Sequence, residues 1–253
     1  MAGSLSPNPQ FHGKPMKKLY YLLFVPVFLA ASMANLAAAS AEDLIQAHLK
    51  AIGGVEANKK HTSRLIKGSL QIPEQGISAE ITIRAKAPNL LRTELEIPGV
   101  GKIVEGFDGK AAWSDNPFTG AAVKPADQQG QARRQAEFYR DVELLTRFDN
   151  WTLKGKESVD GKPVHVLEGK SKDDGAMETI YLDEATHLMV QMKTRDAGAS
   201  ATTRLGDYRW VDGVRFPFSI EVDAGPVGAF SLRVTEVKHG VELDEKLFRL
   251  GAQ

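Results

Sequence analysis

Histidine and carboxylate side chains are the residues of this sequence whose chemistry would support metal binding or catalysis. The chain has six histidines and no cysteine. No two histidines stand at a metal-ligand spacing such as H-x-x-x-H, and thiolate ligands are absent, so we expect no zinc or redox-metal site. The histidines are His12, His48, His61, His165, His187 and His239.

Recognisable catalytic motifs are also absent. The sequence has no G-x-S-x-G elbow, no Walker loop and no glycine-rich dinucleotide fingerprint. Glu94 and Glu96 share one face of a predicted strand, but such exposed carboxylate pairs are common and here neighbour Arg92. His165 lies between two valines, a pattern in which the histidine of a strand typically faces solvent. We therefore expect no catalytic residue, no cofactor and no enzymatic activity.

Composition is that of a globular protein without a dominant charge. Charged residues make up 25% and hydrophobic residues 42% of the 253 residues, and Lys plus Arg equals Asp plus Glu at 32 each. A chain without net charge has no field that would attract nucleic acid, so we expect no nucleic-acid partner.

The N-terminal region has the three parts of a secretory signal peptide. Met16–Lys18 is basic, Leu19–Ala30 is apolar, and small residues follow through Ala37–Ala41. We expect translation to start at Met16 and cleavage to follow Ala39 or Ala41. The alternative is an uncleaved anchor, but the apolar run is short for a membrane span. We thus divide the chain into residues 1–41, the signal peptide and N-terminal extension, and residues 42–253, the folded domain.

Periodicity predicts the elements of that domain. A helix over residues 41–52 has acids in its first turn and glycines behind it, and a short helical turn follows over 55–60. From Arg64 the pattern alternates, as in strands with one apolar face. Eleven strands are predicted over residues 65–72, 77–86, 90–97, 102–107, 151–158, 163–170, 177–183, 188–195, 202–211, 214–222 and 229–237.

Three Asp-Gly pairs predict tight hairpins, because glycine accepts the positive φ of a primed turn and aspartate bonds its own backbone. The pairs are Asp108-Gly109, Asp160-Gly161 and Asp212-Gly213. After the first of them, Asn116–Gly120 is expected to turn the chain out of the sheet. Residues 127–148 predict one long helix, and residues 243–248 a final turn that tucks under the sheet edge.

The predicted fold is mainly β with some α: a strongly bent antiparallel sheet of about eleven strands, an incomplete β-barrel, with helices covering the open side. Nine large apolar residues would face its interior and line an apolar ligand cavity. The alternative is that they form ordinary core, which the sequence supports equally. They are Leu95, Ile97, Phe107, Trp113, Phe138, Val142, Phe216, Phe218 and Phe230.

The signal peptide and several short segments together resemble the periplasmic outer-membrane lipoprotein-sorting proteins, the LolA/LolB-like superfamily. The resemblance covers the whole predicted mature chain. It implies an unclosed barrel with helices over its mouth and an apolar cavity that binds a lipid or the acyl group of a lipoprotein. The segments are Ala51–Gly54, Lys86–Asn89, Phe107–Trp113, Tyr181–Thr186 and Val211–Pro217.

On this basis the expected function is that of a periplasmic carrier or binding protein for a lipid or lipoprotein acyl chain, with envelope membrane proteins as further partners. Two alternatives remain. The chain would be an accessory or scaffold subunit of an envelope complex that pairs through an exposed sheet edge. Less in keeping with the sequence is a secreted hydrolase with two carboxylates in a cleft.

Overall fold

A computed structural model describes residues 39–172, 175–196, 199–225 and 228–252. The predicted start at Met16 and the predicted signal peptide up to residue 38 lie outside these residues. Helices and 3₁₀ turns are α1 (Ala41–Ala51), α2 (Val55–Lys59), η1 (Pro73–Gln75), α3 (Ala126–Ala136), η2 (Arg140–Val142), α4 (Leu144–Arg147) and η4 (Glu245–Phe248). Among the described residues, no helix has the length and apolar character needed to cross a membrane.

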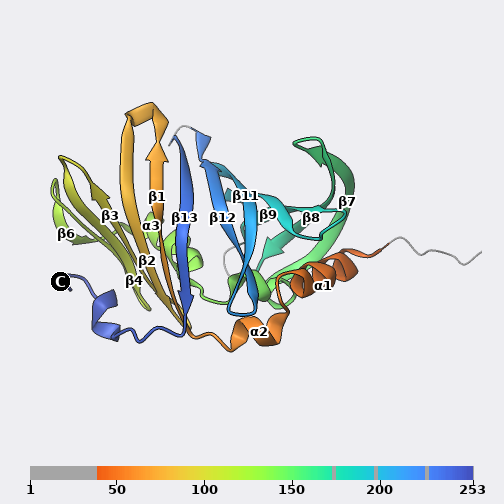
Figure 1. The fold of residues 1–253 in the computed structure, drawn as a ribbon, viewed down its shortest axis with the longest axis horizontal. Helices are drawn as coiled ribbons and strands as arrows, with labels where there is room; N and C mark the ends of the chain where they lie inside the picture. Colours follow the sequence, from red (N-terminus) through yellow and green to blue (C-terminus); the bar gives the residue numbers. More distant parts are fainter. Residues whose placement is uncertain (1–38, 173–174, 197–198, 226–227, 253) are drawn as a thin grey trace, which may run out of the picture. The chain divides into compact units, whose positions relative to one another are not determined.

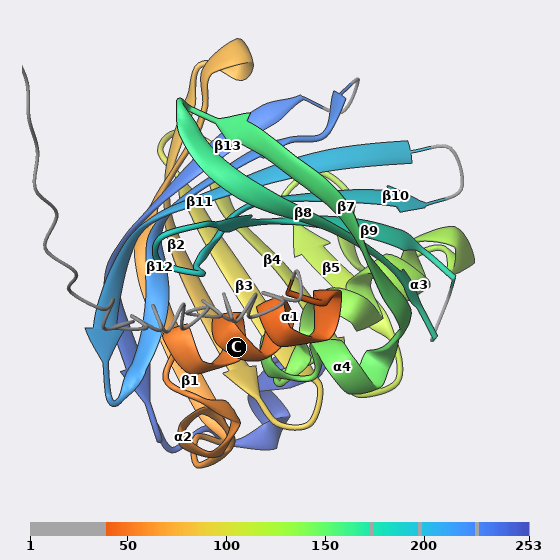
Figure 2. The same ribbon diagram turned by 90° about the vertical axis from the view of Figure 1, so that its right-hand side faces the viewer.

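The strands form one antiparallel sheet in the order β6-β5-β4-β3-β2-β1-β13-β12-β11-β10-β9-β8-β7 (Figure 1). The sheet is not closed, and it curves around α1 and α4 (Figure 2). The predicted class, an open bent antiparallel sheet with helices, is confirmed. The strands are β1 (Ser63–Ile72), β2 (Ile77–Lys86), β3 (Leu90–Ile97), β4 (Gly101–Asp108), β5 (Ala112–Asn116), β6 (Gly120–Val123), β7 (Phe148–Val159), β8 (Lys162–Ser171), β9 (Met177–Asp183), β10 (Met189–Asp196), β11 (Ala199–Val211), β12 (Val214–Asp223) and β13 (Ala229–His239).

The sheet has thirteen strands rather than about eleven, partly because the turn after β5 returns the chain to the sheet. The Asn116 side-chain carbonyl accepts hydrogen bonds from the backbone N–H groups of Phe118 and Thr119, each at 3.0 Å. An Asn that bonds two following amides closes a tight turn. The expectation that this segment leaves the sheet was wrong, since β6 pairs with β5.

Helix α1 begins and ends as its sequence dictates. The Ser40 hydroxyl accepts a hydrogen bond from the Asp43 N–H, and the Asp43 carboxylate accepts one from the Ser40 N–H, which is a capping box. At its end, Gly53 has φ +108°, and a Cβ there would stand 2.5 Å from the Gly213 carbonyl oxygen. Only glycine therefore lets α1 end against the β11–β12 turn.

All three predicted Asp-Gly hairpins exist, but they are not alike. Asp160-Gly161 and Asp212-Gly213 have positive φ at both residues, as a two-residue primed turn requires. At the first hairpin Phe107 pairs with Ala112, so four residues make the loop. There the Asp108 carboxylate accepts hydrogen bonds from the N–H groups of Lys110 and Ala111.

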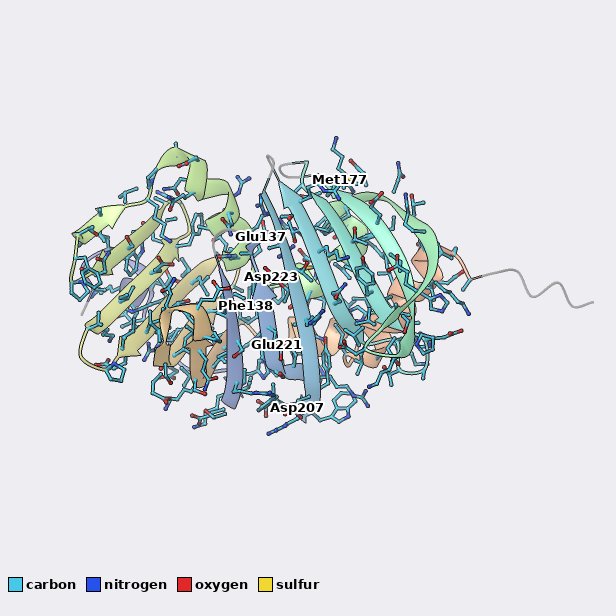
Figure 3. The ribbon with its side chains drawn as sticks, turned by 90° about the horizontal axis from the view of Figure 1, so that it is seen from above. Glu137, Phe138, Met177, Asp207, Glu221 and Asp223 are labelled. Atoms are coloured by element: carbon cyan, nitrogen blue, oxygen red, sulfur yellow. The ribbon has the colours of Figure 1, made fainter. Side chains whose placement is uncertain are left out.

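The single long helix predicted over residues 127–148 is replaced by α3, η2 and α4. The break falls at Glu137, whose backbone is extended, and the next N–H, of Phe138, donates to the Pro88 carbonyl at 3.0 Å. Figure 3 labels Glu137 and Phe138 just past α3. Ala136 packs with Phe107, whereas Val142 packs in the cluster around α1. The break lets this segment contribute to both clusters, and the periodicity did not reveal it.

Register assigns residues to the two faces of the sheet, because directly paired residues of an antiparallel sheet point to the same side. One row runs across five strand pairs from His239 through Arg64, Ala85, Leu91 and Phe107 to Ala112. Helix α3 packs on the Phe107 end of this row. We call this side of the sheet the inner face and the other side the outer face.

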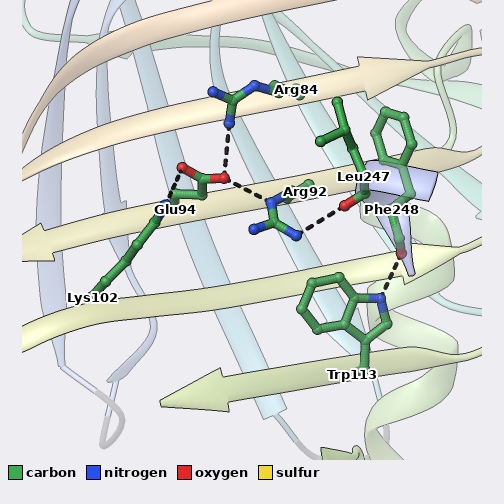
Figure 4. A network of polar contacts seen from close by, with 7 residues as sticks. All are labelled: Arg84, Arg92, Glu94, Lys102, Trp113, Leu247 and Phe248. Atoms are coloured by element: carbon green, nitrogen blue, oxygen red, sulfur yellow. Dashed lines mark hydrogen bonds and ion pairs between the residues drawn. The ribbon is translucent and has the colours of Figure 1, made fainter. Parts of the chain in front are cut away.

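On the outer face, η4 covers β3 and β4 (Figure 4). Arg92 is buried, and its guanidinium bridges the Glu94 carboxylate at 2.7 Å and the Leu247 carbonyl at 2.9 Å. Glu94 also pairs with Arg84 and Lys102. Phe248 is fully buried, which confirms that the final turn tucks in, although it covers β3 and β4 rather than the edge strand.

Trp113 belongs to this outer face. It pairs with Gly106, directly beside the Phe107–Ala112 pair, so Trp113 and Phe107 point to opposite sides of the sheet. A Cβ on Gly106 would lie 2.5 Å from the indole ring, so glycine is what lets the ring lie flat against β4. The indole Nε1 donates a hydrogen bond to the Phe248 carbonyl.

Candidate functional site: an inner-face cavity

The inner face encloses a hollow of about 230 Å³ that we call the central cavity. Helix α1, the η2–α4 segment and strands β1 and β9–β13 contribute to its wall. Its apolar part is formed by Ile52, Leu144, Met189, Met192, Leu205, Val214, Phe216, Pro217 and Ile220. Its polar part is formed by His48, Asn58, Arg64, Arg140, Asp141, Glu178, Thr203, Tyr208, Arg215 and His239.

A second hollow of about 190 Å³, the side pocket, lies beside the first under α3. Its apolar lining comes from Ile66, Ile83, Ala85, Leu91, Ala136 and Phe138. The two hollows share Arg64, Arg140 and Asp141 in their walls. These three side chains therefore divide one region of the inner face into two compartments, and the polar residues Arg134, Gln135 and Glu137 also line the side pocket.

Arg64 is the central feature of this division. Its guanidinium carbon lies 5.0 Å from the ring centre of Phe138, on the side-pocket side, and 5.2 Å from that of Phe216, on the central-cavity side. Its Nε is shielded from solvent, and none of the described residues accepts a hydrogen bond from it. Burial lowers the pKa of Arg64, and the charge of Asp141 opposes that shift. A buried cation without a hydrogen-bonded anion is costly.

Three other charged side chains of the cavity have partners. Arg140 forms an ion pair with the buried Glu178. Burial raises the pKa of Glu178, while the charge of Arg140 opposes that shift. Arg215 lies over the ring of Trp210, with its guanidinium carbon 4.8 Å from the ring centre.

The two histidines of the cavity are held neutral at neutral pH. Burial lowers the pKa of His48, whose Nδ1 is 2.9 Å from the His187 carbonyl. Burial and the charge of Arg64 lower the pKa of His239 to about 4, against the effect of its 3.2 Å contact with Asp212. With both imidazoles neutral, the charged groups of the lining are three arginines and two carboxylates, and one of the arginines, Arg215, has its guanidinium over the exposed Trp210 ring.

Of the nine residues predicted to line a cavity, the structure brings Phe216 to the central cavity and Phe138 to the side pocket. Phe218 and Leu95 pack in the neighbouring inner-face core, Phe107 against Ala136, and Val142 against α1. Ile97 is half-buried and borders neither hollow.

Two further predicted positions do not border either hollow. Trp113 lies on the outer face under η4, because its pairing with Gly106 turns it away from Phe107. Phe230 lines a larger hollow of about 500 Å³ among Lys193, Arg204, Glu221 and Asp223. Figure 3 labels Glu221 and Asp223 on β12. That hollow has a charged lining, which does not favour an acyl chain.

The sequence pattern of β1 indicates that Arg64 faces the core. In β1, Arg64, Ile66 and Leu70 occupy alternate positions, so the alternation that assigns the isoleucine and leucine to the core assigns the arginine to it as well. A charged residue in register with a core face marks a buried charge and hence a candidate site. Among the residues the structure describes, no group of His, Asp and Glu has the geometry of a metal site.

No protein-family model matches this chain, and no curated protein matches it. Solved structures with the same fold include a DUF1329 family protein from Desulfovibrio piger, with 13% identity, a TM-score of 0.58, and coverage of 84% of this chain and 98% of that one. A LolA superfamily protein from Nitrosomonas europaea has 15% identity, a TM-score of 0.56 and the same coverage.

A third structure, a putative outer membrane lipoprotein-sorting protein domain from Vibrio parahaemolyticus, has 12% identity and a TM-score of 0.53. The alignment covers 83% of this chain and 95% of that one. The three likenesses extend over most of the described strands and helices. This chain therefore has a LolA-like fold.

Proposed function

We propose that this protein binds and carries a hydrophobic ligand, the acyl chain of a lipid or of an acylated lipoprotein. The observation that carries the proposal is the central cavity, an apolar hollow between the inner face of a bent sheet and the α1–α4 cover. Each buried methylene of an acyl chain contributes about 0.8 kcal/mol, so a medium chain binds well without further contacts. The lipoprotein-sorting description of the Vibrio structure agrees with this function.

Cavity size sets the form of the ligand. The central cavity, at about 230 Å³, lies just below the range of about 300–1,000 Å³ that small-molecule sites occupy. A longer acyl chain then needs the side pocket as well, and the shared wall of Arg64, Arg140 and Asp141 has to move aside. A single medium-length chain fits this arrangement better than a bulky multi-chain lipid.

The same proposal places the protein in the periplasm. The basic, apolar and small-residue parts of the N-terminus match a secretory signal peptide, and the chain has no cysteine that would carry a lipid anchor after cleavage. We expect the mature protein to be released into the periplasm and its lipid or lipoprotein to pass between envelope membranes. N-terminal sequencing of protein from a periplasmic extract tests this.

The experiment for ligand binding is native mass spectrometry of protein purified from its own envelope without detergent, followed by extraction and identification of the bound molecule. The proposal predicts a mass that exceeds the mature chain by one acyl-containing molecule. A chain that is repeatedly empty, and that also fails to bind added dodecanoate or dodecanol, would contradict it. Leu205→Trp, which fills the central cavity, is expected to remove the adduct, whereas Trp113→Phe on the outer face retains it.

A hydrolase is the weaker alternative. Asp141 and Glu178 are the two carboxylates of the central cavity. The pKa of Glu178 is raised by burial, as suits a general acid. Arg140 forms an ion pair with Glu178, however, and a carboxylate in an ion pair is a poor proton donor. We expect no hydrolysis of p-nitrophenyl esters or glycosides. An activity above background that Glu178→Gln abolishes would favour the hydrolase.

A scaffold role rests on one observation. Edge strand β6 is exposed along its whole length, and Phe118 at the tip of the β5–β6 hairpin is 75% exposed. Such an edge suits strand addition by an envelope protein. In vivo cross-linking from a photoreactive residue at Phe118 tests this. A protein that stays monomeric and yields no cross-linked partner argues against it.

A further inference from the structure

We propose that Arg64 binds the acidic head of the ligand, so that the cargo is a single-chain anionic amphiphile with a carboxylate or phosphate group. This inference rests on the proposed function and deepens it. The Arg64 guanidinium places a positive charge at the junction of the two hollows, and no described carboxylate forms an ion pair with it. An uncharged acyl chain would leave that charge without an anion.

Arg64 has an unsatisfied hydrogen-bond donor. The Arg64 Nε is sealed from solvent and donates to no described residue, and no described carboxylate forms an ion pair with the guanidinium. A planar guanidinium offers a fork of N–H groups that matches a carboxylate or phosphate. The guanidinium carbon lies over the rings of Phe138 and Phe216, which offer no oxygen to its N–H groups and leave them available to an anion.

Among the described residues, no carboxylate near Arg64 forms an ion pair with it. The titratable groups that line the two hollows with Arg64 include Arg134 and Glu137 at the end of α3, Arg140 and Asp141 from η2, Glu178 from β9, Arg215 from β12, and His239 from β13. Glu137 forms an ion pair with Arg147. Glu178 forms an ion pair with Arg140. Asp141 influences Arg64 through space without forming an ion pair. A neutral His239 beside Arg64 adds no charge of its own.

Apolar side chains lie next to the Arg64 charge in both hollows. Met192, Leu205 and Ile220 line the central cavity on one side of Arg64, and Ile83 and Leu91 line the side pocket on the other. An anion at Arg64 would therefore place an attached alkyl chain in one of the two hollows. Neither a free anion nor an uncharged chain would use both features.

Calorimetry with three matched probes tests this: dodecanoate, dodecyl phosphate and dodecanol, each below its aggregation limit. The wild-type protein is expected to bind both anionic probes at least tenfold more tightly than dodecanol. Arg64→Gln is expected to remove that difference while its dodecanol affinity stays within about twofold, which also shows that the cavity still forms. Arg64→Lys is expected to retain part of the preference, because it keeps the charge without the fork.

Arg233→Gln is the matched control, because Arg233 is an exposed arginine on β13 that donates to the Ser219 hydroxyl. It is expected to behave as wild type. Equal affinity for dodecanol and dodecanoate, or a preference that survives in Arg64→Gln, overturns the inference and leaves the proposed function standing. Failure to bind any of the three probes overturns both. Inorganic phosphate that binds as tightly as dodecyl phosphate would identify a free-anion site and overturn the proposal that the ligand is an amphiphile.

Discussion

The indole Nε1 of Trp113 donates a 2.7 Å hydrogen bond to the main-chain carbonyl of Phe248, 135 residues further along the chain. Both residues are almost completely buried on the outer face of the sheet. The contact fixes the C-terminal η4 turn over β3 and β4, where Arg92 and Glu94 extend the same network (Figure 4). This cover stabilises the fold on the side of the sheet opposite to the central cavity.

Trp113→Phe is therefore expected to reduce stability without changing ligand affinity. The ring stays, but the buried Phe248 carbonyl loses its donor, and an unsatisfied buried group of this kind costs about 1–3 kcal/mol. Urea unfolding and dodecanoate calorimetry on the same preparation measure both effects. A loss of affinity at unchanged stability would mean that Trp113 contacts the ligand.

Phe216→Ala, in contrast, is expected to reduce ligand affinity. Phe216 is half-buried, lines the central cavity and lies over Arg64, so its loss removes wall area and opens the site. We expect dodecanoate affinity to fall about tenfold, which corresponds to about 1.4 kcal/mol. Trp113→Phe provides the matched comparison, and equal losses of affinity in both variants would contradict the assignment of the cavity.

Acid should weaken the outer-face network through Glu94. Partial burial would raise the pKa of this carboxyl, but hydrogen bonds from Lys102 and Arg92 and the charge of Arg84 lower it to about 2, from a usual 4.5. A carboxyl with a depressed pKa stabilises the fold fully above its unfolded pKa and loses that contribution as pH falls through the folded value. Stability should therefore decline between about pH 4.5 and pH 2.

Melting curves across that range test this with Glu94→Gln and, as a control, Glu96→Gln at an exposed site on the same strand. Glu94→Gln is expected to be less stable at neutral pH and to show a flatter acid decline than wild type. Glu96→Gln should follow wild type. Identical acid profiles for all three proteins would refute a role for the Glu94 network.

His239 reports on the charge of Arg64. Burial and Arg64 lower the pKa of His239 to about 4. Removal of the positive charge in Arg64→Gln is expected to raise that pKa, whereas Arg233→Gln leaves it unchanged. Proton NMR titration of the imidazole measures both midpoints. Because the folded pKa lies below the unfolded value of 6.5, His239 also destabilises the fold as pH falls from about 6.5 to 4.

Alternation and turn chemistry were enough to predict most strand bounds, since β2 and β3 begin and end at the predicted residues. Local pattern could not predict the break after α3. Phe138, Val142 and Leu145 keep helical spacing, and only the separation of the two inner-face clusters that the segment joins shows why it bends.

The assignment of Trp113 to the cavity depended on the loop length of one hairpin. An even number of loop residues places Phe107 and Trp113 on opposite faces, and an odd number with a bulge places them on the same face. The loop has four residues because Asp108 bonds two successive N–H groups. Arg64 alternates with Ile66 and Leu70 in β1, which indicates an inward side chain, but the predicted strand began at Leu65 and left Arg64 out. The missing partner of Arg64 became visible only in three dimensions.

Photo-crosslinking with a diazirine derivative of dodecanoate tests the central claim most directly, because it reports where the acyl chain lies. After irradiation and peptide mass spectrometry, the account predicts labels at Met192, Leu205 or Phe216, competed by unlabelled dodecanoate and reduced in Leu205→Trp. Labels confined to exposed apolar positions such as Phe118 and Trp210, without competition, would contradict an inner-face cavity as the binding site.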